Sequence, residues 1–351
     1  METRVYFATN RHLVGTTKHP EFSAGFDERL DELRFGTVSF EGASLFERDL
    51  AEISEAARIS VEPEKLNRDD ASKSVLGSKA TFTNIRHDLA EADGALLYVH
   101  GYNYTFRESV GRAVQLKHWL AKDDGPNFVM MIFAWPSTGI GVAPSSYRDD
   151  RKRAESSGIA LGRAILKATD FIRGSPKNER CQARIHLLAH SMGNWALRGA
   201  ISSMRTFVGD NIPPLFEEVI LTAADEDADT LTDAKKLAPI LRGSRRVTVY
   251  YNEQDLALKA SDVAMGNPDR LGRSGPYTNT PLDKKIVCVN VSPTIIYDAD
   301  LRAQPWEIDE TGHQYYRSNH FVRADVIQVL GGAPNEDISG RTPRGTYFRL
   351  G

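Results

Sequence analysis

The 351-residue chain has only two cysteines and no long run of apolar residues. Cys181 and Cys288 are too few for a disulfide framework, and neither belongs to a metal-type cysteine pair. No stretch approaches the roughly 20 apolar residues that a membrane-spanning helix requires. The first ten residues contain no apolar segment of the length found in a secretory leader. We therefore predict a protein without an integral membrane segment, and we expect it to be cytoplasmic.

The chain also has no excess of charge of one sign. Its 44 lysines and arginines against 47 aspartates and glutamates give a formal net charge of -3. The densest basic stretch, residues 148–153, is interrupted by Asp149 and Asp150. Nucleic-acid binding requires a concentrated basic surface. The composition therefore predicts no nucleic-acid partner.

What the sequence does contain is a series of short apolar runs separated by segments of helical length. The runs are nearly continuous in apolar residues, as in strands that are covered on both faces. They occupy residues 95–100, 128–135, 184–189, 219–223, 247–251 and 286–291. Helical patterns lie between them at residues 107–120, 156–172, 194–204 and 232–241. Such alternation predicts an α/β fold with a mostly parallel central sheet and helices on both faces.

The first ninety residues are less regular. Residues 4–9 and 36–40 have strand patterns, and residues 45–59 have helical apolar spacing. We expect antiparallel edge strands and a flanking excursion of the same domain in residues 1–90. The catalytic core would then span residues 91–330, followed by a loop-like tail over residues 331–351. Together these parts predict a single domain over residues 1–351.

Ser191 is the candidate nucleophile, within the sequence Ala189-His190-Ser191-Met192-Gly193. It follows a predicted buried strand and precedes a predicted helix, where a strained turn exposes a serine hydroxyl and requires small flanking residues. The alternative is an ordinary helix N-cap serine. His186 and His190 have the spacing of a zinc pair on a helix, but on a strand they would lie about 13 Å apart. We therefore predict no metal site here.

A serine hydroxyl needs a base to accept its proton and an acid to orient the base. In this strand–turn–serine arrangement the acid and then the histidine follow the serine in the chain. Only His313 and His320 come after Ser191, and we favour His313 because it lies in a polar loop. The acid is Asp255 or Asp225, each just after a predicted strand. We favour Asp255 and keep Asp225 and His320 as alternatives.

Acyl transfer also needs hydrogen-bond donors for the negatively charged oxygen that develops. One predicted donor is the backbone N–H of Met192, directly after the nucleophile. The other is the backbone N–H of Tyr102, in the loop His100-Gly101-Tyr102-Asn103 after the first buried strand. We expect His100 to orient this loop and not to transfer protons.

These motifs resemble one bacterial α/β-hydrolase family, long described as a domain of unknown function and often labelled esterase-like. The resemblance rests on residues 100–103, 133–137 and 189–193, on the strand ends at Asp225 and Asp255, and on Gly312-His313. Residues 6–11 and 35–37 also look like its N-terminal strands. The resemblance implies an α/β-hydrolase fold and a serine hydrolase with Ser191, Asp255 and His313 as its triad.

The function that we expect is hydrolysis of carboxylic esters without a cofactor, with a small acyl ester as substrate. Only about twenty residues separate Asp225 from the next predicted strand, which leaves room for one helix above the site. Two alternatives remain at this point. One is a phospholipase or lipase that acts on membrane lipid, and the other is a non-catalytic binding or scaffold protein on a hydrolase fold.

Overall fold

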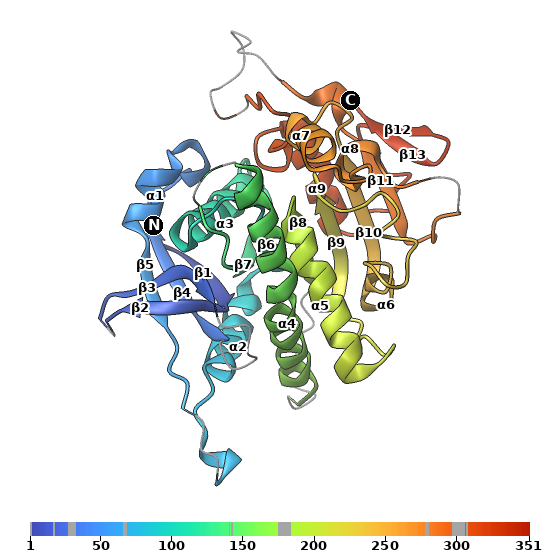
Figure 1. Ribbon diagram of the computed structural model, residues 1–351. Coiled ribbons are helices and arrows are strands. Elements are labelled where there is room, and N and C mark those ends of the chain that lie inside the picture. Colours follow the sequence, from blue (N-terminus) through green and yellow to red (C-terminus); the bar gives the residue numbers. More distant parts are fainter. Residues whose placement is uncertain are drawn as a thin grey trace.

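The computed structural model describes residues 2–16, 18–26, 33–65, 69–139, 141, 143–174, 184–277, 281–296, 306 and 308–351. An 11-stranded sheet forms the centre of this part of the chain, with helices against both faces (Figure 1). Its strands are β1 (Glu2–Thr9), β4 (Arg34–Glu41), β5 (Arg58–Val61), β6 (Gly94–Val99), β7 (Phe128–Phe133), β8 (Ile185–His190), β9 (Phe216–Thr222), β10 (Ser244–Tyr251), β11 (Ile286–Asn290), β12 (Arg341–Arg344) and β13 (Tyr347–Leu350).

The strand order is β12-β13-β11-β10-β9-β8-β6-β7-β1-β4-β5. Neighbours from β13 to β1 pair in parallel, whereas β4, β5 and β12 pair antiparallel at the two edges. Parallel neighbours require long crossovers, which the helices between the strands supply. The predicted α/β fold with a mostly parallel sheet is confirmed.

Helices cover both faces of the sheet. The α-helices of the described residues are α1 (Leu50–Ala56), α2 (Gly77–Asp88), α3 (Phe106–Ala121), α4 (Pro144–Gly174), α5 (Gly193–Val208), α6 (Ile240–Gly243), α7 (Leu256–Met265), α8 (Leu271–Ser274) and α9 (His320–Leu330). In β6, Leu96 and Tyr98 pack with the cores of α3 and α9. Leu97 and Val99 of the same strand pack with α4 and α5. This alternation follows from the two-residue repeat of a strand and explains why the run reads as continuously apolar.

The N-terminal strands were predicted in the correct place and as an antiparallel pair, although β1 lies inside the sheet and also pairs in parallel with β7. Residues 4–9 lie within β1 and residues 36–40 within β4, and the two strands are antiparallel partners. Two further strands, β2 (Arg11–Gly15) and β3 (Pro20–Phe26), form a separate hairpin. The helical pattern over residues 45–59 is only partly correct, because α1 ends at Ala56 and β5 begins at Arg58.

The helix predicted over residues 232–241 is wrong. Turns fill this stretch, and helix begins only at Ile240. The side chain of Asp233 accepts the backbone N–H of Lys235 at 2.7 Å, and Thr232 Oγ1 donates to the carbonyl of Asp229 at 3.0 Å. Such local bonds compete with the hydrogen bonds of a helix. Apolar spacing alone did not reveal this competition.

The loop-like tail predicted for residues 331–351 is also wrong, because it contains the hairpin of β12 and β13. Gly345 has a φ of 61° at the turn, a conformation that favours glycine. Pro343 lies in β12, which is an edge strand and therefore tolerates a missing N–H. Strand β13 pairs in parallel with β11 and extends the sheet.

Cys288 lies buried in β11, and burial raises the pKa of its thiol to about 12. It therefore behaves as a small apolar side chain at neutral pH. Cys181 lies outside the described residues.

A buried ion pair joins the C-terminal hairpin to the core. Asp325 of α9 accepts Nε and Nη2 of Arg341 in β12, both at 2.7 Å, and the hydroxyl of Tyr250 in β10 at 2.5 Å. The side chains of Asp325 and Arg341 are 0% and 1% exposed. Loss of one partner would leave the other charge buried without compensation.

We expect Asp325→Ala to lower the free energy of unfolding by about 3–5 kcal/mol, because it leaves the Arg341 guanidinium unpaired in the core. Urea unfolding followed by far-UV circular dichroism measures this change. The control is Glu41→Ala, which removes a carboxylate from an exposed pair with Arg58 and should change stability by less than about 1 kcal/mol. Equal effects of the two substitutions would contradict the prediction.

Candidate active site

Ser191 occupies the sharp turn between β8 and α5, and its φ of 52° lies in the left-handed region. Its N–H donates to the carbonyl of Thr222, at the end of β9, at 3.1 Å. Its own carbonyl accepts the backbone N–H of Asn194 at 3.1 Å and of Asp225 at 3.2 Å. A non-glycine residue in this region costs on the order of 1–3 kcal/mol. Bonds to the start of α5 and to the end of β9 and the residues after it hold the strained turn in place.

Two glycines let neighbouring backbone approach this turn. A Cβ on Gly193 would lie 2.5 Å from the carbonyl oxygen of His100, and one on Gly101 would lie 2.8 Å from Nδ1 of His190 and 3.0 Å from Cβ of Ser191. Neither distance leaves room for a side chain. The loop after β6 and the turn after β8 are therefore packed backbone to backbone.

The structure brings Ser191, His313 and Asp255 together in one hydrogen-bonded series. Nε2 of His313 lies 2.9 Å from Oγ of Ser191, and Nδ1 lies 2.7 Å from Oδ2 of Asp255. A carboxylate only accepts hydrogen bonds, so Nδ1 carries the proton and Nε2 is free to accept that of the serine. Asp255 is fully buried, and its Oδ1 accepts the N–H of Leu258 at 2.9 Å as the N-cap of α7. This arrangement has the geometry of a serine nucleophile with its base and orienting acid.

In both His313 and Asp255, the interaction with the other group shifts the pKa in the direction opposite to the shift caused by burial. Burial on its own lowers the pKa of His313, but the charge and hydrogen bond of Asp255, with smaller contributions from Asp309 and Asp225, raise the pKa above its usual 6.5. For Asp255, burial raises the pKa of the carboxyl and its interaction with His313 lowers it, with a net rise. The two groups therefore stabilise each other most when the imidazole is protonated and the carboxylate is charged.

The two alternative residues have different surroundings. Asp225 is buried and lines the same pocket, but it accepts hydrogen bonds from the Tyr147 hydroxyl at 2.7 Å and from Ser261 Oγ at 3.0 Å. His320 is exposed at the first residue of α9, with its ring centroid 4.2 Å from that of Phe321. It is not among the residues that line the pocket of Ser191.

His190 and Asn252 hold the loop that carries His313. Nε2 of His190 lies 3.1 Å from the carbonyl oxygen of His313, and Nδ2 of Asn252 donates to the carbonyl of Gly312 at 2.8 Å. Burial holds the pKa of His190 well below its usual range, so the ring is neutral and donates from Nε2. Its ring also packs on Tyr316, with centroids 4.5 Å apart. Neither supporting role was predicted from the sequence, because both depend on contacts with a distant loop.

The loop predicted to supply an oxyanion donor is fixed by two side chains from the next crossover. Oγ of Ser137 accepts the N–H of Asn103 at 2.8 Å and donates to Asp150 at 2.6 Å. His100 stacks on Trp135 with centroids 5.0 Å apart, and the Trp135 indole donates to the His100 carbonyl at 2.7 Å. Burial lowers the pKa of His100 to about 3, so it is neutral. The contacts of Ser137 and Asp150 were also missed from sequence.

The hydrogen-bonded series of Ser191, His313 and Asp255 opens into a pocket of about 460 Å³. Tyr102, Asn103, Tyr104, Pro144, Tyr147, His190, Ser191, Asp225, Ala257, Leu258, Ala260, Ser261, His313 and Gln314 line it. More than half of these residues have polar side chains, and the small apolar ones come mainly from α7. Met192, the other predicted oxyanion donor, is the buried N-cap residue of α5. The pocket thus lies where the loops after β6 and β8 meet the start of α7.

Across the described ranges, no group of three or more His, Cys, Asp and Glu side chains is arranged to hold a metal ion. His186 and His190 lie on one strand, as predicted. No described helix combines the length and apolar character needed to cross a bilayer.

The model of a family described as alpha/beta hydrolase of unknown function (DUF900) matches residues 78–330. A search of curated proteins found no match. The matched range covers more than half of the chain and includes every residue of the candidate site, whereas β1 to β5 precede it. The match does not reach residues 6–11 and 35–37, which the resemblance also included. The chain therefore belongs to this family of α/β hydrolases.

Proposed function

We propose that the protein is a serine hydrolase that cleaves carboxylic esters through an acyl-enzyme intermediate. One observation carries the proposal: Oγ of Ser191 lies 2.9 Å from Nε2 of His313, whose Nδ1 lies 2.7 Å from Asp255, inside a pocket. Membership of a hydrolase family supports the reaction class. The fold alone would not, because one fold hosts many activities.

In the first half of the reaction, Ser191 Oγ attacks the carbonyl carbon of the ester while His313 Nε2 accepts its proton. Asp255 stabilises the imidazolium that forms. The tetrahedral intermediate collapses, His313 donates the proton to the departing alkoxide, and the acyl group stays on Ser191. Water then attacks the acyl-enzyme with His313 as base, which releases the carboxylic acid and restores the serine.

The proposed oxyanion donors are the backbone N–H groups of Tyr102 and Met192. Met192 precedes the first residue of α5, where the helix dipole favours negative charge. The loop that carries Tyr102 is held by Ser137 and Asp150 before substrate arrives. Preplaced donors of this kind stabilise the transition state because they need no reorganisation during the reaction.

The pocket supports a small, soluble ester as substrate. Between Thr222 and Ser244 the chain forms turns and the four-residue α6, so this segment supplies no large lid. The carboxylate of Asp225 and the amides of Asn103 and Gln314 line the pocket. These groups have partners within the protein, because Asp225 accepts from Tyr147 and Ser261, Asn103 Oδ1 from the N–H of Gly141 and Gln314 Oε1 from Nε of Arg317. Without a large lid from the segment after β9 the site is open, which favours a small, soluble ester.

We expect Ser191→Ala to abolish covalent labelling by a fluorophosphonate probe and to lower kcat/KM for p-nitrophenyl butyrate by on the order of 10⁴-fold or more. Ser203→Ala, in α5 and outside the pocket lining, should retain both. Labelling is read by in-gel fluorescence. An unlabelled wild-type protein would favour the non-catalytic scaffold, and turnover of phospholipid vesicles but not of soluble esters would favour the lipase.

Amide variants of Asp255 and Asp225 distinguish which of the two residues orients His313. We expect Asp255→Asn to lower kcat by on the order of 10⁴-fold, because an amide no longer holds His313 in the correct tautomer. Asp225→Asn should cost less than about tenfold, because Asp225 contacts Tyr147 and Ser261 and not the imidazole. Steady-state kinetics with p-nitrophenyl butyrate measure both, and the reverse order would assign the acid to Asp225.

The pH profile of kcat/KM supplies an independent readout of the same pair. Because the pKa of His313 is raised above 6.5 and the base must be neutral, wild-type activity should be low at acidic pH and rise through a midpoint above 6.5. The Asp225 charge contributes to that rise, so Asp225→Asn should move the midpoint to lower pH. A midpoint that does not move would show that this charge does not reach the base.

His190→Leu should lower kcat by about 10–100-fold with little change in KM, because the His313 loop loses its hydrogen bond and misplacement of about 1 Å is costly. His190→Gln places an amide donor at similar reach and should restore most of the activity. Thermal unfolding of both variants shows whether they are folded. Equal losses in the two variants at equal stability would rule out the positioning role.

A further inference from the structure

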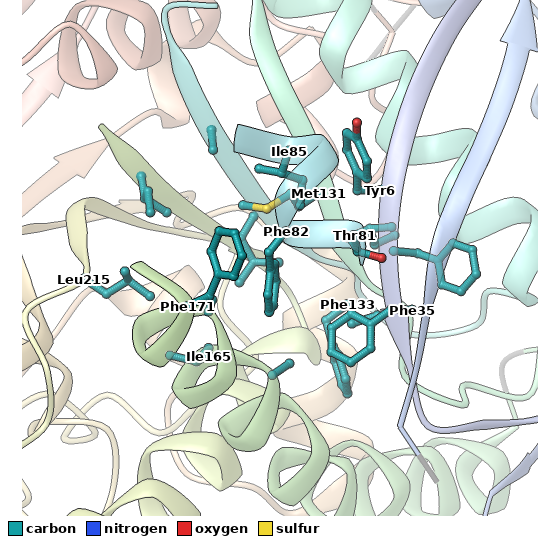
Figure 2. A pocket seen from close by; sticks show the side chains of 18 of the residues that line it. Tyr6, Phe35, Thr81, Phe82, Ile85, Met131, Phe133, Ile165, Phe171 and Leu215 are labelled. Atoms are coloured by element: carbon teal, nitrogen blue, oxygen red, sulfur yellow. The ribbon is translucent and has the colours of Figure 1, made fainter. Parts of the chain in front are cut away.

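A second cavity, of about 110 Å³, lies between the sheet and helices α2 and α4. Figure 2 shows its labelled side chains, which include Phe82 and Ile85 of α2 and Ile165 and Phe171 of α4. It shares no lining residue with the pocket of Ser191. The ester hydrolysis proposed above therefore makes no use of it.

The cavity is long for its volume. It is lined by at least one residue from each of β4, β1, β7, β6, β8 and β9, which are six consecutive strands of the sheet. Five intervals of about 4.8 Å between neighbouring strands give a span of roughly 24 Å. The lining is therefore elongated across the sheet, and we call this cavity the slot. This shape suits a linear chain better than a compact ring system.

The walls are almost entirely hydrocarbon. Three phenylalanines follow one another along the slot, with ring centroids 5.6 Å apart for Phe35 and Phe82 and 5.7 Å apart for Phe82 and Phe171. Tyr6 turns its hydroxyl to the carboxylate of Asp88, at 2.6 Å. Water gains few hydrogen bonds in such a cavity, whereas an apolar ligand fits it without loss.

The one charged side chain among the described residues of the lining is a cation. Arg86 of α2 is half-buried in the lining, with its Cζ 5.4 Å from the ring centroid of Phe171. Among the lining residues that the structure describes, none is Asp or Glu. A ligand with an apolar body and one negative end complements this distribution.

We propose that this cavity is a binding site for a fatty acid, with the alkyl chain in the slot and the carboxylate at Arg86. The proposal goes beyond the esterase function and does not depend on it. The aromatic row supplies contact along the chain, and the guanidinium sets the direction in which the chain enters. Bound ligand would fill space between α2, α4 and the sheet and so stabilise the folded protein.

The test is calorimetric titration of Ser191→Ala and wild type with octanoate, decanoate and dodecanoate below their micelle concentrations. Both proteins should bind one molecule per chain with equal affinity, and each added methylene should strengthen binding by about fourfold. Dodecanol, which lacks the charge, should bind about tenfold more weakly than dodecanoate. No saturable binding to either protein would overturn the proposal and identify the cavity as an empty packing defect.

Variants of the cavity locate the site. Ala168 of α4 lines the slot, so Ala168→Phe should fill it and weaken dodecanoate binding at least tenfold, whereas Ala168→Ser should not. Arg86→Gln should weaken dodecanoate but leave dodecanol unchanged. Hydrolysis of p-nitrophenyl butyrate or, if the chain is inactive, cooperative thermal unfolding checks the fold, and Ala164→Leu, also in the lining, replaces Ala168→Phe if that variant does not fold.

Two results would contradict this location. One is undiminished dodecanoate binding by folded Ala168→Phe or Ala164→Leu. The other is competition between dodecanoate and a fluorophosphonate at Ser191, which would place the fatty acid in the catalytic pocket. Neither result bears on whether Ser191 is the nucleophile, so failure of this proposal and failure of the proposed esterase function remain distinguishable.

Discussion

The conformation of Ser191 is the constraint on which the candidate site depends. Its φ of 52° turns the backbone away from the direction of β8. This conformation is stabilised because Thr222 accepts the N–H of Ser191 while the backbone N–H groups of Asn194 and Asp225 donate to its carbonyl. The same geometry removes space for side chains at Gly101 and Gly193. The loop after β6 therefore packs directly on the turn, which brings the backbone around Tyr102 to the nucleophile's side of the sheet.

The two carboxylates near His313 differ in their hydrogen-bond partners. Asp225 is surrounded by the hydroxyls of Tyr147 and Ser261 and lies 3.8 Å from the fully buried Arg270. Its hydrogen bonds are directed away from the imidazole, so it acts on His313 only through its charge. Asp255 has a single backbone partner, at Leu258, and keeps an oxygen for Nδ1 of His313. Burial makes the second arrangement effective, because a poorly solvated carboxylate gains more from a protonated neighbour.

The sequence predicted those features whose cause is local. Strands β6 and β7 are covered on both faces, so their sequences are runs of apolar residues. The turn at Ser191 requires small residues that are close to it in the chain. The hairpin at residues 341–350 was missed because it is stabilised by pairing with β11 and by the buried Asp325–Arg341 pair. The roles of His190 and Asn252 were missed for the same reason, since their partners are backbone carbonyls about 123 and 60 residues away.

The second cavity shows a different limit of sequence patterns. Leu97, Met131 and Ile165 have the spacing of core residues, and periodicity reports correctly that they face inward. The periodicity of apolar residues does not indicate whether these side chains contact the side chains opposite them. Here Phe82 and Phe171 stand 5.7 Å apart along the slot and the space beside them is not filled. Its lining is a row of aromatic and aliphatic side chains, so a molecule that enters the slot meets mainly hydrocarbon. That surface is the physical reason to expect a ligand with an apolar body.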